Sequence, residues 1–370
     1  MRDEVFYTPI LKGKANDLKA LGKVPRAFIH RLSPVVELLS PNEGESLDDA
    51  HARFAHQLRK FCPLHTISVD LHAISPDGRL RDGSLALEAL CACLRGVGLR
   101  FVPVYGFDHE PELWDRVASI GRREGRGLTF RLKPEDLEAC EDTVADVIGR
   151  LKDAGISAAD THLLIDLGSL ATVDGVELVR LRSACQDFIE AASSAADFLG
   201  LSLAGSSMPS DVSEVPVEGT KTYPRREIAL WAETMTSLPS RAVGYGDYGI
   251  VHPSFSDKII ATNANAKIRY TSQTDHHIFR GYNLKKGLKY QQYHEIAQRV
   301  VASPPFMGRD YSFGDERTWL CSKHEVSCGN LGTWVEVDMN HHLVFVGEQL
   351  PRVASLLAQG ALAAEALHAD

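Results

Sequence analysis

The sequence lacks any long hydrophobic stretch. None of its apolar runs approaches the roughly 18 residues that suggest a membrane-spanning helix. The first ten residues, MRDEVFYTPI, are charged and lead directly into a predicted strand, so they do not have the pattern of a secretory signal peptide. We therefore expect a cytoplasmic protein that does not engage a membrane.

The cysteines follow no disulfide pattern. The chain has seven cysteines, an odd number, without the spacing of a disulfide framework. Five of them lie in or beside predicted helices, where cysteine usually acts as a small buried hydrophobic residue. These five are Cys62, Cys91, Cys93, Cys140 and Cys185, and the other two are Cys321 and Cys328. This usage is typical of a reducing cytoplasm.

An excess of positive charge is also missing. The chain has 40 Lys and Arg residues against 49 Asp and Glu residues, a formal net charge of −9. Bulk charge therefore does not attract the protein to nucleic acid or to an anionic membrane. One local basic cluster, formed by Arg280, Lys285, Lys286 and Lys289, is better explained as a solvated helix start.

The dominant positive feature is a pattern repeated eight times, in which a short apolar run ends in polar residues and a helix-like stretch or loop follows. The runs cover residues 6–12, 32–39, 66–72, 100–108, 128–133, 162–168, 201–207 and 242–251. Helical periodicity is clearest in residues 45–60, 83–95, 135–152 and 173–199. Eight strand–helix units in a row close a (β/α)8 barrel. We therefore predict an α/β fold, a TIM-like barrel over residues 1–256.

The repeat stops near residue 256, and residues 257–370 have a different rhythm. Residues 289–303 are predicted to form a helix, residues 306–320 a glycine-bearing loop leading into a helix start, and residues 334–346 a strand. An alanine- and leucine-rich helix follows. No low-complexity linker separates this part from the barrel, so we predict a C-terminal α+β extension that packs on the barrel.

Polar side chains gather where the eight predicted strands end. They are Lys12, Glu37, Asp70, His72, Tyr105, Asp108, Arg131, Lys133, Asp166, Ser206, Ser207 and Asp247. In a barrel these ends meet at one mouth, where ligands bind and chemistry occurs. Buried charges must pair or face water. The pattern predicts a polar, ligand-binding mouth, with the alternative that the opposite charges neutralise one another and plug the barrel.

The sequence lacks the residues that are typical of several familiar barrel enzymes. The first run offers Ile-Leu-Lys at 10–12 where a metal-dependent amidohydrolase has a His-x-His pair, and Asp166 stands where a Schiff-base aldolase often has lysine. Where retaining glycosidases place glutamates, run four offers Tyr105 with Asp108 and run seven offers Ser206. A phosphodiesterase with two mouth histidines is also unmatched, because only His72 lies at a strand end.

Phosphate binding is the chemistry that the remaining pattern favours. Barrels often hold phosphate near the last two strands with glycine-rich turns. The seventh run ends in AGSSMPSD (204–211) and the eighth contains GYGDYG (244–249). Ser206 and Ser207 would approach the anion, with Arg131 or Lys133 supplying charge. Alternatively, these turns are plain loops, or Mg²⁺ is held by the carboxylates of Glu37, Asp70, Asp166 and Asp247.

Two histidine pairs occur in the predicted extension, His276 with His277 and His341 with His342. Adjacent histidines on a strand point to opposite faces, so each pair offers at most one ligand to a shared site. Zinc would need a further ligand such as Cys321 or His324. A structural role is favoured, with the histidines hydrogen-bonded at the seam between extension and barrel.

Four segments resemble a known family. The opening YTPILKGK, the second-strand segment PVVEL, and the later segments YSFGDERTWL and GTWVEVDMNHHL are similar to the "beta protein" family of bacterial and phage-associated proteins. The resemblance runs over nearly the whole chain and is strongest toward its two ends. Members sit near restriction and other anti-phage genes, which implies a defence context. No catalytic residues carry over from this resemblance.

Two functions remain open at this stage. The first is a ligand-binding component of an anti-phage defence system that binds a phosphate-containing ligand or a protein partner at the mouth. Its ligand-binding residues would be Lys12, Glu37, Arg131, Lys133, Ser206, Ser207 and Asp247. The alternative is a phosphate-ester hydrolase, with Asp70 or Asp166 as base or metal ligand and His72 as acid. No cofactor is assigned, and Mg²⁺ is the candidate.

Overall fold

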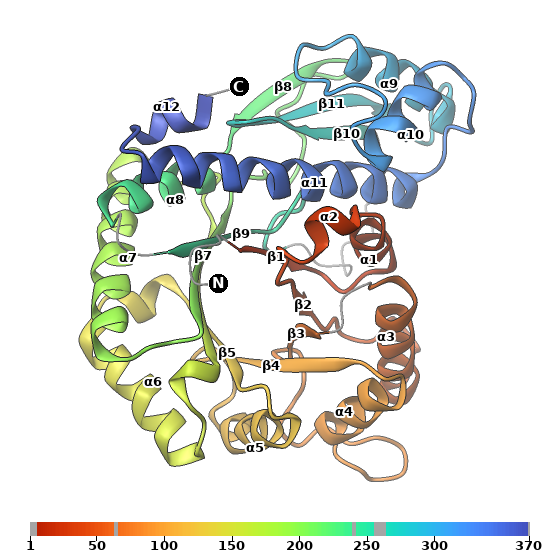
Figure 1. The fold of residues 1–370 in the computed structure, drawn as a ribbon. Coiled ribbons are helices and arrows are strands. Elements are labelled where there is room, and N and C mark those ends of the chain that lie inside the picture. Colours follow the sequence, from red (N-terminus) through yellow and green to blue (C-terminus); the bar gives the residue numbers. More distant parts are fainter. Residues whose placement is uncertain (1–5, 63–65, 239–241, 255–263, 369–370) are drawn as a thin grey trace.

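The computed structural model describes residues 6–62, 66–238, 242–254 and 264–368. Eight parallel strands close into a barrel in the order β1-β2-β3-β4-β5-β6-β7-β9 (Figure 1). The strands are β1 (Tyr7–Leu11), β2 (Val35–Glu37), β3 (Thr66–Asp70), β4 (Arg100–Gly106), β5 (Leu128–Leu132), β6 (Thr161–Ser169), β7 (Gly200–Ser206) and β9 (Val243–Asp247). Each overlaps one of the eight predicted runs, which confirms the predicted TIM-like barrel.

Helices follow the strands and cover the outside of the barrel. They are α1 (Ala15–Gly22), α2 (Arg26–Ile29), α3 (Leu47–Phe61), α4 (Ala86–Gly96), α5 (Trp114–Glu124), α6 (Cys140–Ala154), α7 (Gly175–Ala195) and α8 (Arg226–Ser237). Short 3₁₀ turns occur at Pro111–Leu113, Pro134–Leu137, Ala158–Asp160 and Lys289–Gln292. Side-chain caps mark two helix starts, because Ser46 and Asp174 accept backbone hydrogen bonds from the first turns of α3 and α7. The four helices predicted from periodicity are confirmed.

The barrel interior is filled by alternate residues of the strands. Ile10, Val35, Val104, Leu164, Ala204 and Tyr248 form one buried apolar cluster there. Small polar pairs share this inner space, since Thr8 hydrogen-bonds Ser202 and Ser68 hydrogen-bonds Thr129, both at 3.0 Å. Side chains two residues further along the same strands also point inward. The sequence alternation therefore directs the charged residues at the strand ends into the mouth.

A small antiparallel sheet lies beside the barrel. Its strands are β8 (Thr220–Pro224), β10 (Asn265–Thr271) and β11 (Asp275–Asn283), in the order β10-β11-β8. One face packs against α9 (Tyr293–Val301) and α10 (Phe313–Ser322) around the stacked rings of Tyr293 and Trp334. The helix predicted near 289–303 is confirmed. Strand β8 comes from the connection between β7 and α8, so a segment of the predicted barrel range completes this sheet.

The long helix α11 (Leu331–Ala358) completes the barrel. It packs against α1, α8 and β1, and Figure 1 shows it running between the barrel and the small sheet. The prediction of a strand over 334–346 was wrong. Apolar and polar residues alternate from Val335 to Met339, which imitates a strand, while burial of every residue from Val337 to Gly347 removes the one-faced helical pattern. The final helix is α12 (Ala363–His368).

The proposed domain division is only partly visible in this arrangement. The predicted boundary at residue 256 lies outside the described residues. The small sheet and helices α9 and α10 are inserted between the eighth barrel strand, β9, and α11, which occupies the position of the eighth barrel helix. Strand β8 of the small sheet therefore comes from the predicted barrel range, and helix α11 of the barrel comes from the predicted extension.

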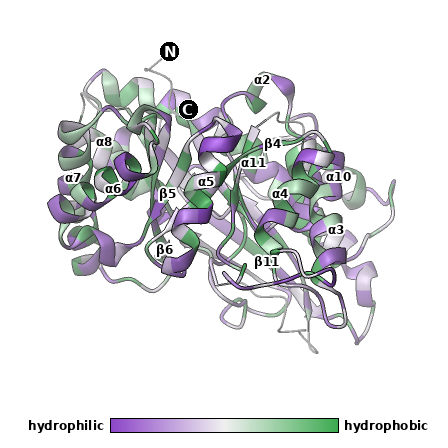
Figure 2. Ribbon diagram, turned by 90° about the horizontal axis from the view of Figure 1, so that it is seen from below, coloured by the Kyte–Doolittle hydropathy of each residue, from purple (hydrophilic) through white to green (hydrophobic). Residues whose placement is uncertain are grey.

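Hydropathy along the helices agrees with this packing. Figure 2 shows barrel helices that carry both hydrophilic and hydrophobic residues, as expected when one face contacts the strands. Among the described residues, no helix combines the length and the apolar character needed to cross a bilayer. All seven cysteines are free thiols, and burial raises the pKa of Cys91 and Cys185 to about 12.

Candidate functional site

Arg131 is the centre of the barrel mouth. Its guanidinium is buried and donates to the carboxylates of Asp70, Asp166 and Glu37, which come from β3, β6 and β2. The Asp166 and Glu37 contacts are 2.9 Å each. The Tyr248 hydroxyl lies 2.7 Å from one guanidinium nitrogen and donates to Asp166 at 2.7 Å. Every guanidinium nitrogen of Arg131 is therefore engaged by the protein.

Two lysines complete this network. Lys12 pairs with Glu37 at 2.6 Å, and Lys133 pairs with Asp166 at 2.6 Å. Three cations and three carboxylates thus meet at the mouth, and their formal charges cancel. The structure brings together six of the predicted strand-end residues and favours the alternative in which opposite charges plug the barrel.

The network keeps Asp70 and Asp166 ionised. Burial alone raises the pKa of Asp166, but Arg131 and Lys133 outweigh burial and hold this pKa well below its usual range. The pKa of Asp70 is lowered in the same way, against burial, by Arg131 and His109. Burial raises the pKa of Tyr248 well above its usual value, and the neighbouring Asp166 adds to the effect. Asp70 and Asp166 are therefore anchored charges at neutral pH.

Asp247 lies outside this network. It points away from the barrel interior, where it accepts hydrogen bonds from the Tyr7 hydroxyl at 2.7 Å and from the Gly249 N–H at 2.9 Å. Its other oxygen lies 2.9 Å from Nε2 of His342 on α11. The reason is strand alternation: glycines at 244 and 246 take the inward positions of β9, so Asp247 faces the helix layer.

The predicted Mg²⁺ set is consequently not gathered around a shared space. Glu37, Asp70 and Asp166 surround Arg131, and Asp247 faces the other way. The two predicted phosphate-binding serines also have local partners. The Ser206 hydroxyl accepts from the Met208 N–H at 3.2 Å, and the Ser207 hydroxyl accepts from the Arg226 N–H at 2.9 Å at the start of α8.

The rim between β3 and β4 carries a histidine that the sequence reasoning missed. His109 lies next to His72, with ring centroids 5.1 Å apart, and both are close to Asp108. His72 and Asp108 are exposed, whereas His109 is buried against Tyr105. Burial lowers the pKa of His109. His109 comes three residues after the end of β4, so only the turn geometry places it at the mouth.

Three of the four paired histidines make contacts across the seam, and His277 bonds within the small sheet. His341 contacts Asp315 at 2.8 Å and the Thr271 carbonyl at 2.9 Å, while His342 bridges Thr271 and Asp247. His276 lies 3.4 Å from Glu227, and His277 contacts Ser272 at 2.9 Å. Cys321 and His324 lie beside His294 instead of beside either pair.

A cavity of about 290 Å³ lies at the seam between the barrel mouth and the extension. Its walls come from the ends of the first and last barrel strands, the loop after β7, the small sheet, and the first turns of α1 and α11. The lining residues are Lys12, Lys14, Asn16, Asp17, Met208, Pro209, Ser210, Asp211, Val212, Ile250, Val251, His252, Lys267, Arg269, Ile278, Leu331, Gly332 and Val335. We call this the seam cavity.

The seam cavity is lined by more positive than negative side chains. Four lysines and arginines line it against two aspartates. Lys12 pairs with Glu37, and Arg269 lies 3.5 Å from Asp338. Within the described part of the chain, the ammonium of Lys267 makes no hydrogen bond or ion pair. Burial, assisted by the neighbouring Arg269, lowers the pKa of Lys267 to about 8.

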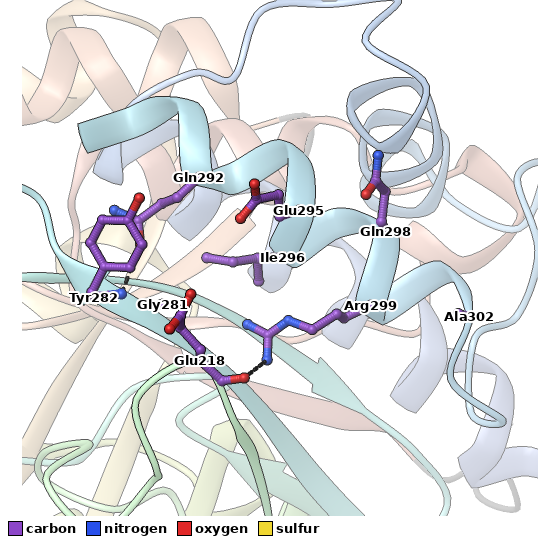
Figure 3. A pocket seen from close by; sticks show the side chains of 9 residues that line it. All are labelled: Glu218, Gly281, Tyr282, Gln292, Glu295, Ile296, Gln298, Arg299 and Ala302. Atoms are coloured by element: carbon purple, nitrogen blue, oxygen red, sulfur yellow. Dashed lines mark hydrogen bonds between the residues drawn. The ribbon is translucent and has the colours of Figure 1, made fainter. Parts of the chain in front are cut away.

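A second cavity, of about 420 Å³, lies in the extension between β11 and α9 (Figure 3). Glu218, Glu295 and Arg299 are its charged residues. The Arg299 guanidinium donates to the backbone carbonyls of Glu218, Gly219 and Arg280, so it holds the loop before β8 against the sheet. None of the predicted site residues lines this cavity.

Comparison with known proteins identifies the chain at the level of its family. A search of the curated proteins finds no match. A family model described as Beta protein matches residues 7–348, which is most of the chain and includes both the barrel and the extension. The predicted resemblance is thereby confirmed, and the chain belongs to the Beta protein family.

Proposed function

We propose that the protein binds a small phosphate-containing ligand in the seam cavity. The observation that carries the proposal is the Lys267 ammonium, which faces this cavity without a protein partner among the described residues. A half-buried ammonium that forms no ion pair is unfavourable, and a bound anion removes that cost. The first turns of α1 and α11 also line the cavity, so the positive ends of two helix dipoles lie at its wall.

The proposed location is next to the serines of the predicted phosphate site, but most of its lining residues differ from the predicted ones. Met208, Pro209, Ser210 and Asp211 of the predicted phosphate loop line the seam cavity. Arg131 and Lys133, the predicted anion ligands, are engaged by carboxylates, so Lys267 and Arg269 of β10 take that role in the proposal. A volume near 290 Å³ is at the small end for ligand pockets, which suits a phosphosugar or a mononucleotide.

The wider role that we propose is a ligand-binding component of an anti-phage defence system. This part rests on the family resemblance and its gene context, and the seam cavity is independent of it. A phosphate-ester hydrolase is the second candidate, favoured by the approach of His109 and His72 to Asp70 at the mouth. The binding role has better support, because Asp70 and Asp166 are both committed to Arg131.

The first test is thermal stability of the purified protein against inorganic phosphate, nucleotides and phosphosugars. A ligand at about 100 times its dissociation constant stabilises the folded state by about 2.7 kcal/mol, which gives a visible rise in melting temperature. We expect Lys267→Met to abolish the rise, because it removes the unpaired cation. Lys285→Met, which removes an exposed lysine of the extension, should leave the rise unchanged. A rise that survives Lys267→Met would place the ligand elsewhere, and no rise with any compound would contradict the proposal.

Anion affinity should also depend on pH through Lys267. Only the protonated ammonium attracts the ligand, and its pKa in the ligand-free protein is about 8. Affinity should therefore be full below pH 8 and fall above it, by up to about tenfold for each pH unit. Calorimetric titration between pH 7.5 and about 9.5 measures this, with a ligand whose own charge is constant there. Lys267→Arg should flatten the profile, because arginine stays protonated; an unchanged profile in that variant would exclude Lys267 as the cause.

A further inference from the structure

The turn after β4 folds a carboxylate and an imidazole back over the barrel mouth. The His109 N–H donates to the Gly106 carbonyl at 3.0 Å, which closes the turn. A Cβ atom at Gly106 would lie 2.6 Å from an Asp108 carboxylate oxygen and 2.5 Å from the Arg131 carbonyl. Glycine at this position is therefore required for Asp108 to lie where it does, next to His72 from the end of β3.

His109 is the fixed member of this group. Its side chain is about 1% exposed and packs edge-on against Tyr105, with ring centroids 5.3 Å apart. Its Nδ1 is buried and has no hydrogen-bond partner in the described part of the chain. Its Nε2 lies 3.5 Å from Asp70 and 3.8 Å from Asp108. Neither Nε2 contact is a short hydrogen bond, so Nε2 is the nitrogen of His109 that is available to a ligand beside Asp108.

We propose that His72, Asp108 and His109 bind a divalent transition-metal ion at the barrel mouth. One ligand atom from each residue lies within 4.8 Å of the other two. Two imidazole nitrogens and one carboxylate oxygen suit zinc, cobalt or iron(II), whereas calcium and magnesium prefer sites made of oxygen alone. The site is built from residues outside the seam cavity, so it stands independently of the proposed anion binding.

The group can contract to metal-binding distances without disturbing the core. Bonds of about 2.0–2.1 Å in a tetrahedral site place ligand atoms about 3.3–3.5 Å apart. His72 and Asp108 are exposed and free to approach, while the buried His109 stays in place. Lys133 lies 3.9 Å from Asp108 and is the competing cation, but its closer partner is Asp166.

Asp70 lies directly beneath the three residues of the proposed site. Asp70 accepts the His72 backbone N–H at 2.9 Å and lies beside Nε2 of His109, and Arg131 holds its other oxygen. Asp70 therefore fixes the backbone at His72 and adds negative charge beside the proposed site, which favours a cation. The proposed site has three protein ligands, and two of them are exposed. A bound metal ion would therefore keep coordination positions that are open to solvent.

Titration of the metal-stripped, tag-free full chain with Co²⁺ tests the site, followed by visible absorption and calorimetry. We expect one equivalent to bind, with absorption bands of low-symmetry cobalt, and Zn²⁺ to displace it. His72→Gln and Asp108→Asn should each weaken binding by about 100-fold or more, since even loss of an outer-shell partner costs about 10- to 100-fold. Both residues are exposed, so both variants should fold.

His56→Gln, which changes an exposed histidine of α3, is the matched control and should bind Co²⁺ like the parent chain. Unchanged affinity in His72→Gln and Asp108→Asn would place any bound cobalt at another site and overturn the assignment. Absence of Co²⁺ and Zn²⁺ binding to the parent chain would overturn it as well.

Discussion

Replacement of Arg131 by methionine should destabilise the protein by about 3–5 kcal/mol, the range measured when one partner of a buried ion pair is removed. The guanidinium is the shared partner of Glu37, Asp70 and Asp166. Without it, Asp70 loses its strongest counter-charge in a fully buried position. Equilibrium unfolding in urea measures the loss as a fall in the free energy of unfolding.

Two further variants sharpen this test. Arg131→Lys keeps the charge, but a single ammonium lacks the fork that reaches three carboxylates, so we expect an intermediate loss. Arg95→Met breaks a surface pair with Glu124 and should cost less than about 1 kcal/mol. If Arg131→Met proves no more destabilising than Arg95→Met, the mouth network does not stabilise the barrel.

Asp247→Ala should destabilise the protein by about 3 kcal/mol or more. The substitution leaves the Tyr7 hydroxyl, the Gly249 N–H and the His342 ring without their shared acceptor, and each buried unsatisfied group costs about 1–3 kcal/mol. Because His342 belongs to α11, amide hydrogen exchange should also become faster in that helix. Urea unfolding and exchange followed by mass spectrometry measure the two effects.

The controls separate the hydrogen bonds of Asp247 from simple truncation. Asp247→Asn keeps the size and one acceptor oxygen, so it should cost clearly less than alanine. Asp187→Ala changes an exposed aspartate of α7 and should stay within about 0.5 kcal/mol of the parent. If amide hydrogen exchange in α11 is the same in Asp247→Ala as in the parent, apolar packing alone holds this helix on the barrel.

The barrel was predictable because its strands are buried on both faces. Parallel strands of this kind read as short continuous apolar runs, and most of the runs here end in a polar residue at the mouth, with Asp247 as an exception because it faces α11. Two elements escaped prediction for opposite reasons. Strand β8 has an exposed, polar sequence without an apolar run, whereas α11 is buried on so many sides that it shows no helical stripe.

The position of the candidate site at the barrel mouth was predictable, but the ion pairs among its side chains were not. Strand-end charges such as Arg131 and Asp166 could be placed at the mouth from alternation alone. Whether these side chains form ion pairs with one another depends on distances in the folded protein, which no sequence pattern gives. His109 was missed because a turn, and not a strand, aims it at the mouth, and Lys267 was missed because it arrives from the small sheet across the seam.

The position of α11 also sets the order in which a nascent chain can mature. A ribosome makes β9 first, then residues 248–330, and only then the helix that covers the junction of β9 with β1. Until Ala358 has left the exit tunnel, the apolar outer face of this junction stays uncovered. Vectorial synthesis therefore makes the inserted strands and helices before the helix that seals the barrel, and α11 completes two cores at once, because Trp334 and Val337 also belong to the core of the small sheet.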